Sequence, residues 1–363
     1  MYHGIVATKP DKVVYVYSKD SEKALITLRK ELNYPEDSYP PLDPTDPKEI
    51  FERAELLAER YKDDEVTVNI SSGLKSWSHL FGRVFDARPN ASIVYMDQNN
   101  VLWNYRTMKP EEGFNFDMEM LFRLYGNPLK HFTKYADYTD QDACAAQEIE
   151  RIRHYQTSQF NDLLTVLNKA WSNQLDQQKH GRFDHAKGAY VEWDKPDFVR
   201  INLVQAKRGP SEVTITSPHA VALAFKSGWF EYKVARMLSH WKYAKDICMN
   251  CKFPPSKAPN QTQFPKNEID VIVNTGTKLL FVECKTKINN STDIDKFRTA
   301  VRNYGGNGSK ALFVTDEPMT DIQKEKCTES GITPLSLSDP AIGPNKEQEL
   351  FALLNKILFD INI

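Results

Sequence analysis

Two apolar segments near residue 270, separated by a short turn, constrain the fold of this chain most. Residues 269–273 are all isoleucine or valine apart from Asp270, and residues 279–284 are again mostly apolar. Residues 275–277, Thr-Gly-Thr, supply a turn between them. Apolar runs of this length that are bounded by a turn are typical of neighbouring buried strands. The sequence therefore predicts two adjacent strands that together carry an aspartate, a glutamate and a lysine.

The charged side chains of these two strands indicate a chemistry. Glu283 and Lys285 are two residues apart, so they point to the same face of their strand. Asp270 lies among β-branched residues, where an unpaired carboxylate is costly. Two carboxylates hold Mg²⁺ or Mn²⁺, the metal polarises a phosphate and activates a water, and a lysine steadies negative charge. The alternative for the triplet alone is a solvated strand end, but the surroundings of Asp270 favour metal-dependent phosphodiester hydrolysis.

A glutamate upstream of these strands supports the same interpretation. Residues 228–238 have helical spacing, with Phe230, Val234 and Leu238 on one stripe. Glu231 falls in the first turn, from which it can reach the sheet that the helix covers. Taken alone, it is more simply a glutamate favoured by the helix dipole. Beside two carboxylates and a lysine, we expect it to belong to the site.

The order of these residues resembles a known nuclease fold. Helical Glu231, then Asp270, then Glu283-Cys284-Lys285 is similar to the PD-(D/E)xK restriction-endonuclease-like fold, and residues 267–271 and 283–286 resemble the nuclease domain of the CRISPR-associated Rossmann fold (CARF) nucleases. The resemblance implies Asp270, Glu283 and Lys285 as the catalytic residues, with Glu231 accessory. It implies Mg²⁺ or Mn²⁺ held by Asp270, Glu283 and Glu231.

Length and patterning predict an α/β protein of three parts. At 363 residues the chain is long enough for two domains and a small third. Segments 12–17, 66–70 and 92–96 are predicted strands that alternate with helices, which is typical of a parallel, doubly wound sheet. We expect a Rossmann-like CARF domain over residues 1–140, a helical and β-wing connector over residues 141–216, and the restriction-endonuclease-like domain over residues 217–363.

Two loops after the predicted N-terminal strands offer hydroxyls, helix-start N–H groups and a lysine, which suit a phosphate. Helix capping is the alternative on the residues alone. Residues 69–75 resemble the polar loop with which CARF domains receive cyclic oligoadenylate, although residues 72 and 74 differ from its usual form. The resemblance implies an activator site, and most of the family's first strand–helix unit is absent or replaced ahead of residues 10–14. The expected activator-binding residues are Ser18, Lys19, Ser71, Ser72, Gly73, Lys75 and Asp97.

Composition excludes some other classes of protein. No window of about 18 apolar residues is present, and residues 1–6 lack the features of a signal peptide, so we expect a cytoplasmic protein without membrane contact. Five scattered cysteines suit a reducing compartment. Cys248 and Cys251 have CxxC spacing, but no second pair completes a zinc site. A net charge of −2 requires that nucleic acid be held by local patches.

Three functions remain open from the sequence. The resemblance implies a metal-dependent endonuclease that cuts single-stranded DNA, RNA or both, or nicks duplex DNA. It would be activated by cyclic oligoadenylate, with cyclic tetra-adenylate the first expectation, in type III CRISPR antiviral defence. A homodimer follows, because a two-fold symmetric ring fits a two-fold cleft. The alternatives are an unregulated restriction-like DNase whose N-terminal domain only dimerises, and a non-enzymatic nucleotide-sensing module.

Overall fold

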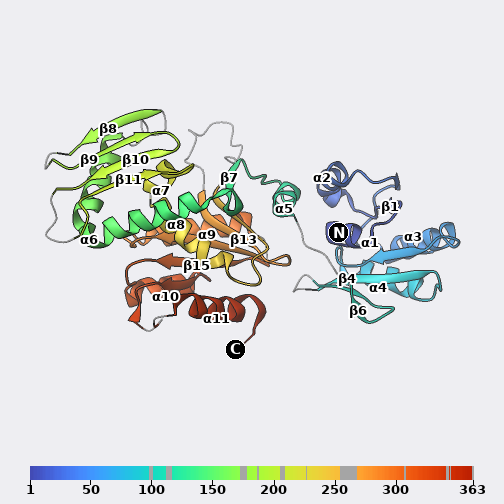
Figure 1. The fold of residues 1–363 in the computed structure, drawn as a ribbon. Coiled ribbons are helices and arrows are strands. Elements are labelled where there is room, and N and C mark those ends of the chain that lie inside the picture. The colour runs from blue at the N-terminus through green and yellow to red at the C-terminus, as the bar shows by residue number, and fades with distance from the viewer. Residues whose placement is uncertain are drawn as a thin grey trace.

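A computed structural model describes most of the chain as two lobes (Figure 1). The described residues are 1–97, 101–111, 117–171, 178–185, 188–204, 209–225, 227–253, 268–305, 308–340, 343 and 345–361. Asn267 of the predicted motif lies outside them. The N-terminal elements form one lobe, and the elements after α5 (Met118–Leu124) form the other (Figure 1). Within the described residues, no helix is long and apolar enough to cross a membrane.

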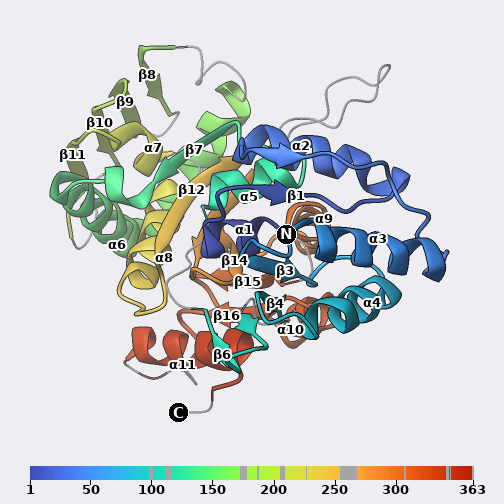
Figure 2. The same cartoon turned by 90° about the vertical axis from the view of Figure 1, so that its right-hand side faces the viewer.

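The N-terminal lobe is an α/β unit built on a mixed sheet. The sheet has the order β3-β4-β5-β6, in which β3 and β4 are parallel and the other pairs are antiparallel. Helices α3 and α4 pack beside each other along it (Figure 2). Its elements are α1 Tyr2–Thr8, β1 Val13–Val14, η1 Lys19–Ser21, α2 Glu22–Leu32, β2 Glu36–Asp37, α3 Pro47–Arg60, β3 Val66–Asn69, α4 Lys75–Asp86, β4 Ala91–Met96, β5 Leu102–Asn104 and β6 Lys109–Pro110.

The predicted α/β class is confirmed, but the first strand departs from a doubly wound parallel sheet. In the described part of the chain, β1 forms a separate two-stranded ladder with β2. The proline-rich segment after α2 lies along the predicted strand 12–17, since Val13 N donates to Pro35 O and Leu42 N to Tyr17 O, both at 2.8 Å. Among the described residues, β1 therefore pairs with β2 and with none of the strands β3 to β6.

The middle of the chain forms a small antiparallel sheet against a long helix. The sheet has the order β11-β10-β9-β8, and α6 bends at Gln156, where the backbone is non-helical. Strand β8 was missed by the sequence analysis because its residues are largely polar. The elements are β7 His131–Lys134, η2 Tyr135–Asp137, α6 Asp140–Trp171, β8 His180–Asp184, β9 Tyr190–Asp194, β10 Phe198–Asn202, β11 Glu212–Thr216 and α7 Ala220–Ala224.

The C-terminal part is a six-stranded mixed sheet covered by helices on both faces. Its order is β16-β15-β14-β13-β12-β7, with β14, β15 and β16 parallel. Strand β7, which precedes the predicted connector, adds to this sheet's edge through β12. The elements are α8 Gly228–Ser239, β12 Asp246–Lys252, β13 Glu268–Asn274, β14 Leu279–Lys285, α9 Thr292–Tyr304, β15 Lys310–Thr315, α10 Asp321–Glu329, β16 Thr333–Ser336 and α11 Lys346–Phe359.

Alternate side chains of the central strands enter two different cores. Val271, Val273 and Val282 join the cluster that packs on α8, whereas Ile272 and Phe281 join the cluster under α9. Such burial on both faces explains why these strands read as continuous apolar runs. A charged side chain within such a strand must find its partners inside the protein.

Candidate active site

Strands β13 and β14 bring the three predicted charged residues together. The antiparallel register aligns Val271 with Val282, which sets Asp270 beside Glu283. Lys285 Nζ lies 3.2 Å from Asp270 Oδ2 and 2.6 Å from Glu283 Oε1. The backbone N–H of Cys284 also donates to Asp270 Oδ2 at 2.8 Å. Asp270 is therefore oriented by the neighbouring strand as well as by the lysine.

Glu231 of α8 lies within electrostatic reach of these residues. It lies in the first turn of that helix and only 8% of it is exposed. The helix starts close to α7, because a Cβ at Gly228 would lie 1.9 Å from the backbone oxygen of Ala222. The charge of Asp270 is the largest influence after burial on the pKa of Glu231, which places the two carboxyl groups in one electrostatic environment. A side chain at position 228 would push the first turn of α8 away from α7.

Burial and mutual repulsion make the carboxyl groups hard to ionise together. Burial, followed by the charge of Asp270, raises the pKa of Glu283 to about 8 and that of Glu231 well above its ordinary value. Burial also raises the pKa of Asp270, against the opposing effects of Lys285 and the Cys284 N–H. Burial lowers the pKa of Lys285, but Asp270 and Glu283 outweigh it and keep the ammonium charged. A divalent cation would relieve the repulsion among the acids.

The oxygen donors fit Mg²⁺ or Mn²⁺, but Lys285 now stands between two of them. Carboxylates are the ligands that these hard cations prefer. Within the described ranges, no three Asp, Glu, His or Cys side chains are already arranged around a common ion position. Since the ammonium bridges Asp270 and Glu283, a cation bound by both carboxylates requires that Lys285 turn aside.

Two candidate activator residues of the N-terminal lobe, Ser71 and Asp97, are held by hydrogen bonds to neighbouring side chains and backbone N–H groups. Ser71 Oγ donates to Asn69 Oδ1 at 2.6 Å and accepts from Met96 N at 2.7 Å. Asp97 accepts from Val101 N at 2.9 Å and Trp103 Nε1 at 3.1 Å. These bonds bring the loops after β3 and β4 together at the carboxyl ends of two parallel strands, the edge at which ligands bind in such sheets.

The other candidate activator residues are more exposed. Ser72, Gly73 and Lys75 are exposed at the start of α4, and Gly73 has φ +113°, which favours glycine. Lys19 is exposed as well. Ser18 N donates to Ser21 Oγ at 3.0 Å, a bond within its own capping turn. The structure joins Ser71 to the Asp97 loop through Met96, and does not join Ser18 to it by these bonds.

The CxxC pair serves the core. Cys248 and Cys251 are buried in the cluster under α9, and Asn250 between them has φ 53° at a bulge in β12. Burial raises the pKa of Cys248 to about 12 and that of Cys251 well above its ordinary value. Neutral, enclosed thiols of this kind behave as small apolar side chains.

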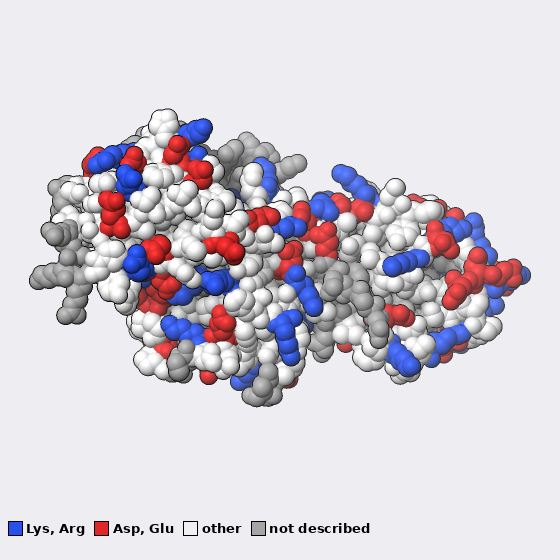
Figure 3. All heavy atoms as spheres, viewed as in Figure 1, with Lys and Arg blue, Asp and Glu red and all other residues white. Residues whose placement is uncertain are grey.

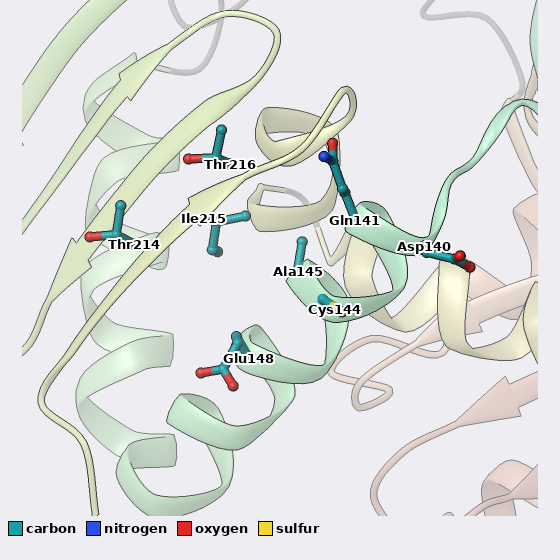
Figure 4. Close-up of a pocket in the computed structure, with 8 residues that line it drawn as sticks. All are labelled: Asp140, Gln141, Cys144, Ala145, Glu148, Thr214, Ile215 and Thr216. Atoms are coloured by element: carbon teal, nitrogen blue, oxygen red, sulfur yellow. The ribbon is translucent and has the colours of Figure 1, made fainter.

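Two cavities lie apart from the carboxylates. One of about 310 Å³ lies between α6 and β11 and is lined by residues such as Cys144, Ala145 and Ile215 (Figure 4). Another of about 350 Å³ lies where α5 meets the six-stranded sheet, with Glu119, Lys134 and Lys245 in its wall. Neither includes a proposed catalytic residue, so the chemistry of the side chains, and not cavity size, locates the candidate active site.

The surface does not present a broad basic face for nucleic acid in the view of Figure 3. Lys and Arg alternate with Asp and Glu over both lobes there, apart from the residues that are not described. This agrees with the net charge of −2. That nucleic acid is held by local basic patches stays a prediction.

Sequence reasoning missed the charged residues beside the end of β14, the strand that carries Lys285. Asp316 and Glu317 directly follow β15, which runs parallel to β14, so both strands end at the same edge. Their position directly after the apolar run 311–315, which is typical of a buried strand, was a signal that we did not use. Arg153, which pairs with Asp316 across 163 residues of sequence, had no such signal.

Comparison with known proteins extends these observations to the whole chain. No family model matches the sequence, and no curated protein matches it. Among solved structures, Can2 from Sulfobacillus thermosulfidooxidans, in complex with cyclic tetra-adenylate, aligns with a TM-score of 0.63 at 18% identity, covering 98% of this chain and 96% of that one. The predicted fold class is confirmed, since nearly the whole chain has the architecture of Can2. The alignment includes both lobes.

Two further structures agree on the fold. Protein VC1899 from Vibrio cholerae aligns with a TM-score of 0.69 at 15% identity, over 98% of this chain and 95% of its own. A type III CRISPR defence DNA nuclease activated by cyclic oligoadenylate aligns with a TM-score of 0.55 at 16% identity, over 96% of this chain and 50% of its own. Identities this low establish the architecture, and the activity of this chain has to be argued from its own residues.

Proposed function

We propose that this protein is a metal-dependent endonuclease that is switched on by cyclic oligoadenylate in type III CRISPR defence. The observation that carries the nuclease half is the contact of Lys285 Nζ with Asp270 and Glu283 on two buried strands. Charged groups at this depth are expensive and are retained where they act. The similarity in fold to a DNA nuclease supports the same reaction class.

Each residue has a role that its position supports. Asp270, Glu283 and Glu231 would hold Mg²⁺ or Mn²⁺, which when bound polarises a phosphate and supplies an activated water. Lys285, released from the carboxylates, would stabilise negative charge on the attacked phosphate. Asp270 is kept in place by the Cys284 N–H even when the lysine moves. Glu231, buried in the first turn of α8, would be an accessory ligand of the metal or of its water.

The N-terminal lobe supplies the proposed switch. Ser71, Ser72, Gly73 and Lys75 lie at the carboxyl end of β3, and Asp97 follows β4. The complex of Can2 with cyclic tetra-adenylate supports a cyclic oligoadenylate as the activator. A homodimer would provide a two-fold cleft for a two-fold symmetric ring, and ligand binding would shift the arrangement of the two nuclease units.

One observation favours an unregulated DNase as the second candidate. The side-chain oxygens of Ser71 and Asp97 already form hydrogen bonds with Asn69, Met96, Val101 and Trp103. A ligand that competes for them would have to break those bonds. In this second candidate the N-terminal lobe only joins two copies of the chain.

A cleavage assay with Mn²⁺ on RNA, single-stranded DNA and duplex DNA, with and without cyclic tetra-adenylate or cyclic hexa-adenylate, tests both halves. We expect cleavage that Glu283→Gln lowers by about 100-fold or more. Glu325→Gln is the matched control, because Glu325 is an exposed glutamate of α10 that lies outside the site. Equal cleavage by wild type and Glu283→Gln would reject the site, and cleavage indifferent to both rings would favour the unregulated enzyme.

A further inference from the structure

Arg153 of α6 is a buried arginine that contacts Asp316 and Glu317, at the edge of the candidate active site. It is 7% exposed. Its Nη1 lies 2.6 Å from Asp316 Oδ2 and its Nη2 lies 3.6 Å from Glu317 Oε1. Its Nε is buried and has no hydrogen-bond partner among the described residues. Burying an arginine costs desolvation free energy, which its ion pairs and hydrogen bonds must offset.

The backbones of Asp316 and Glu317, the two acids that pair with Arg153, are hydrogen-bonded to the end of β14, the strand that carries Lys285. Asp316 N donates to Lys285 O at 3.2 Å, and Glu317 N donates to Thr286 O at 2.9 Å. The Asp316 carbonyl also accepts from the Ser338 hydroxyl. The backbone of the segment after β15 is thus held by β14 on one side and by Ser338 on the other. Arg153 holds the side chains of Asp316 and Glu317. A displacement of Asp316 would displace the backbone of Lys285.

The same guanidinium also touches the helix that carries Glu231. Its central carbon lies 5.1 Å from the ring centroid of Trp229, in the first turn of α8. Lys233 of that helix has its Nζ 3.9 Å from the second oxygen of Asp316. Arg153 therefore joins the two segments from which Glu231 and Lys285 project, although it belongs to neither.

We infer that Arg153 is a positioning residue that sets Lys285 relative to Glu231 by clamping Asp316 and Trp229. This inference rests on the proposed nuclease function. A direct grip on substrate phosphate is the competing role, but both acids already neutralise the buried guanidinium. A phosphate ligand would need a free, accessible cation.

The experiment compares cleavage kinetics of Arg153→Met, Arg153→Lys and Asp316→Asn with those of wild type in Mn²⁺. We expect Arg153→Met to lower kcat by about 10- to 100-fold while KM stays within about twofold, because small misplacements of reacting groups carry losses of that order. Arg153→Lys should recover part of kcat, and Asp316→Asn should resemble Arg153→Met. The matched control is Arg151→Met, an exposed arginine of α6 that pairs with Glu148, which should match wild type.

The outcomes separate this inference from the proposed function. A wild-type protein without metal-dependent cleavage would overturn both. An active wild type with unchanged kcat in Arg153→Met would overturn the inference alone, as would a rise in KM with kcat unchanged, which indicates substrate binding. If Arg153→Met unfolds at assay temperature, Asp316→Asn and Arg153→Lys decide: full kcat in both, with wild-type thermal midpoints, rejects the positioning role.

Discussion

At the scale of single residues, the acids around Lys285 should make stability depend on pH. The pKa of Glu283 is raised from 4.5 to about 8, so the folded protein holds a proton that the unfolded chain has released. Between these values stability falls as pH rises. Without divalent metal, Glu283→Gln should unfold at higher temperature than wild type at pH 8, by an amount corresponding to about 3–5 kcal/mol, and should show little difference near pH 4.5.

Thermal unfolding in a chelator at both pH values measures this, with Glu325→Gln as the control that should follow wild type throughout. Added Mn²⁺ should raise the wild-type midpoint at pH 8 and leave Glu283→Gln nearly unmoved, since a ligand that binds only the folded state stabilises it. A midpoint for wild type that is independent of pH from 5 to 8 would contradict the assignment of Glu283 as a buried, raised-pKa acid.

At the scale of elements, the close packing of the start of α8 against α7 should affect cleavage activity. A Cβ at position 228 would meet the Ala222 carbonyl at 1.9 Å, and backbone cannot yield as a flexible side chain does. Gly228→Ala should therefore shift the first turn of α8, lower the free energy of unfolding by about 1–3 kcal/mol, and reduce kcat through Glu231. Gly82→Ala is the control: nothing lies within 4 Å of a Cβ there, and alanine favours a helix by about 1 kcal/mol.

Urea unfolding and Mn²⁺-dependent cleavage of both glycine variants give the two quantities. A Gly228→Ala protein with wild-type kcat and wild-type stability would show that the close approach of α7 and α8 does not place Glu231. A destabilised Gly82→Ala would mean that α4 is held by contacts that the described residues do not reveal.

At the scale of the whole molecule, the two lobes should communicate through the activator. Lys75 is exposed at the start of α4, beside the loop that follows β3. If it contacts a phosphate, Lys75→Gln should raise the cyclic tetra-adenylate concentration for half-maximal cleavage by about tenfold, the loss expected for one charged hydrogen bond. Lys48→Gln, which alters an exposed lysine of α3 paired with Glu52, should leave that concentration unchanged.

Cleavage titrated with the ring measures the shift, and sedimentation at the same concentrations measures assembly. We expect a dimer with or without the ring. A monomer that cleaves normally would contradict the two-fold arrangement, and identical half-maximal concentrations for the two lysine variants would remove Lys75 from the activator site.

The sequence by itself determined the strands around the candidate site, because local pattern suffices there. The β-branched runs at 269–273 and 279–284 predicted β13 and β14, and the two-residue spacing predicted that Glu283 and Lys285 share a face. It also predicted that Glu231 lies in the first turn of a helix. All of these properties depend on neighbours within a few residues, and the structure retains them.

Only the tertiary structure decided what depends on distant partners. The segment 12–17 reads as a strand, yet the proline-rich chain that lies beside it takes its hydrogen bonds. The pairing of Arg153 with Asp316 spans 163 residues, and the bridge of Lys285 between two acids forms only when two strands pair in one register. Hydrophobic periodicity encodes which face is buried, but the partner that meets that face is chosen by the packing of the whole chain.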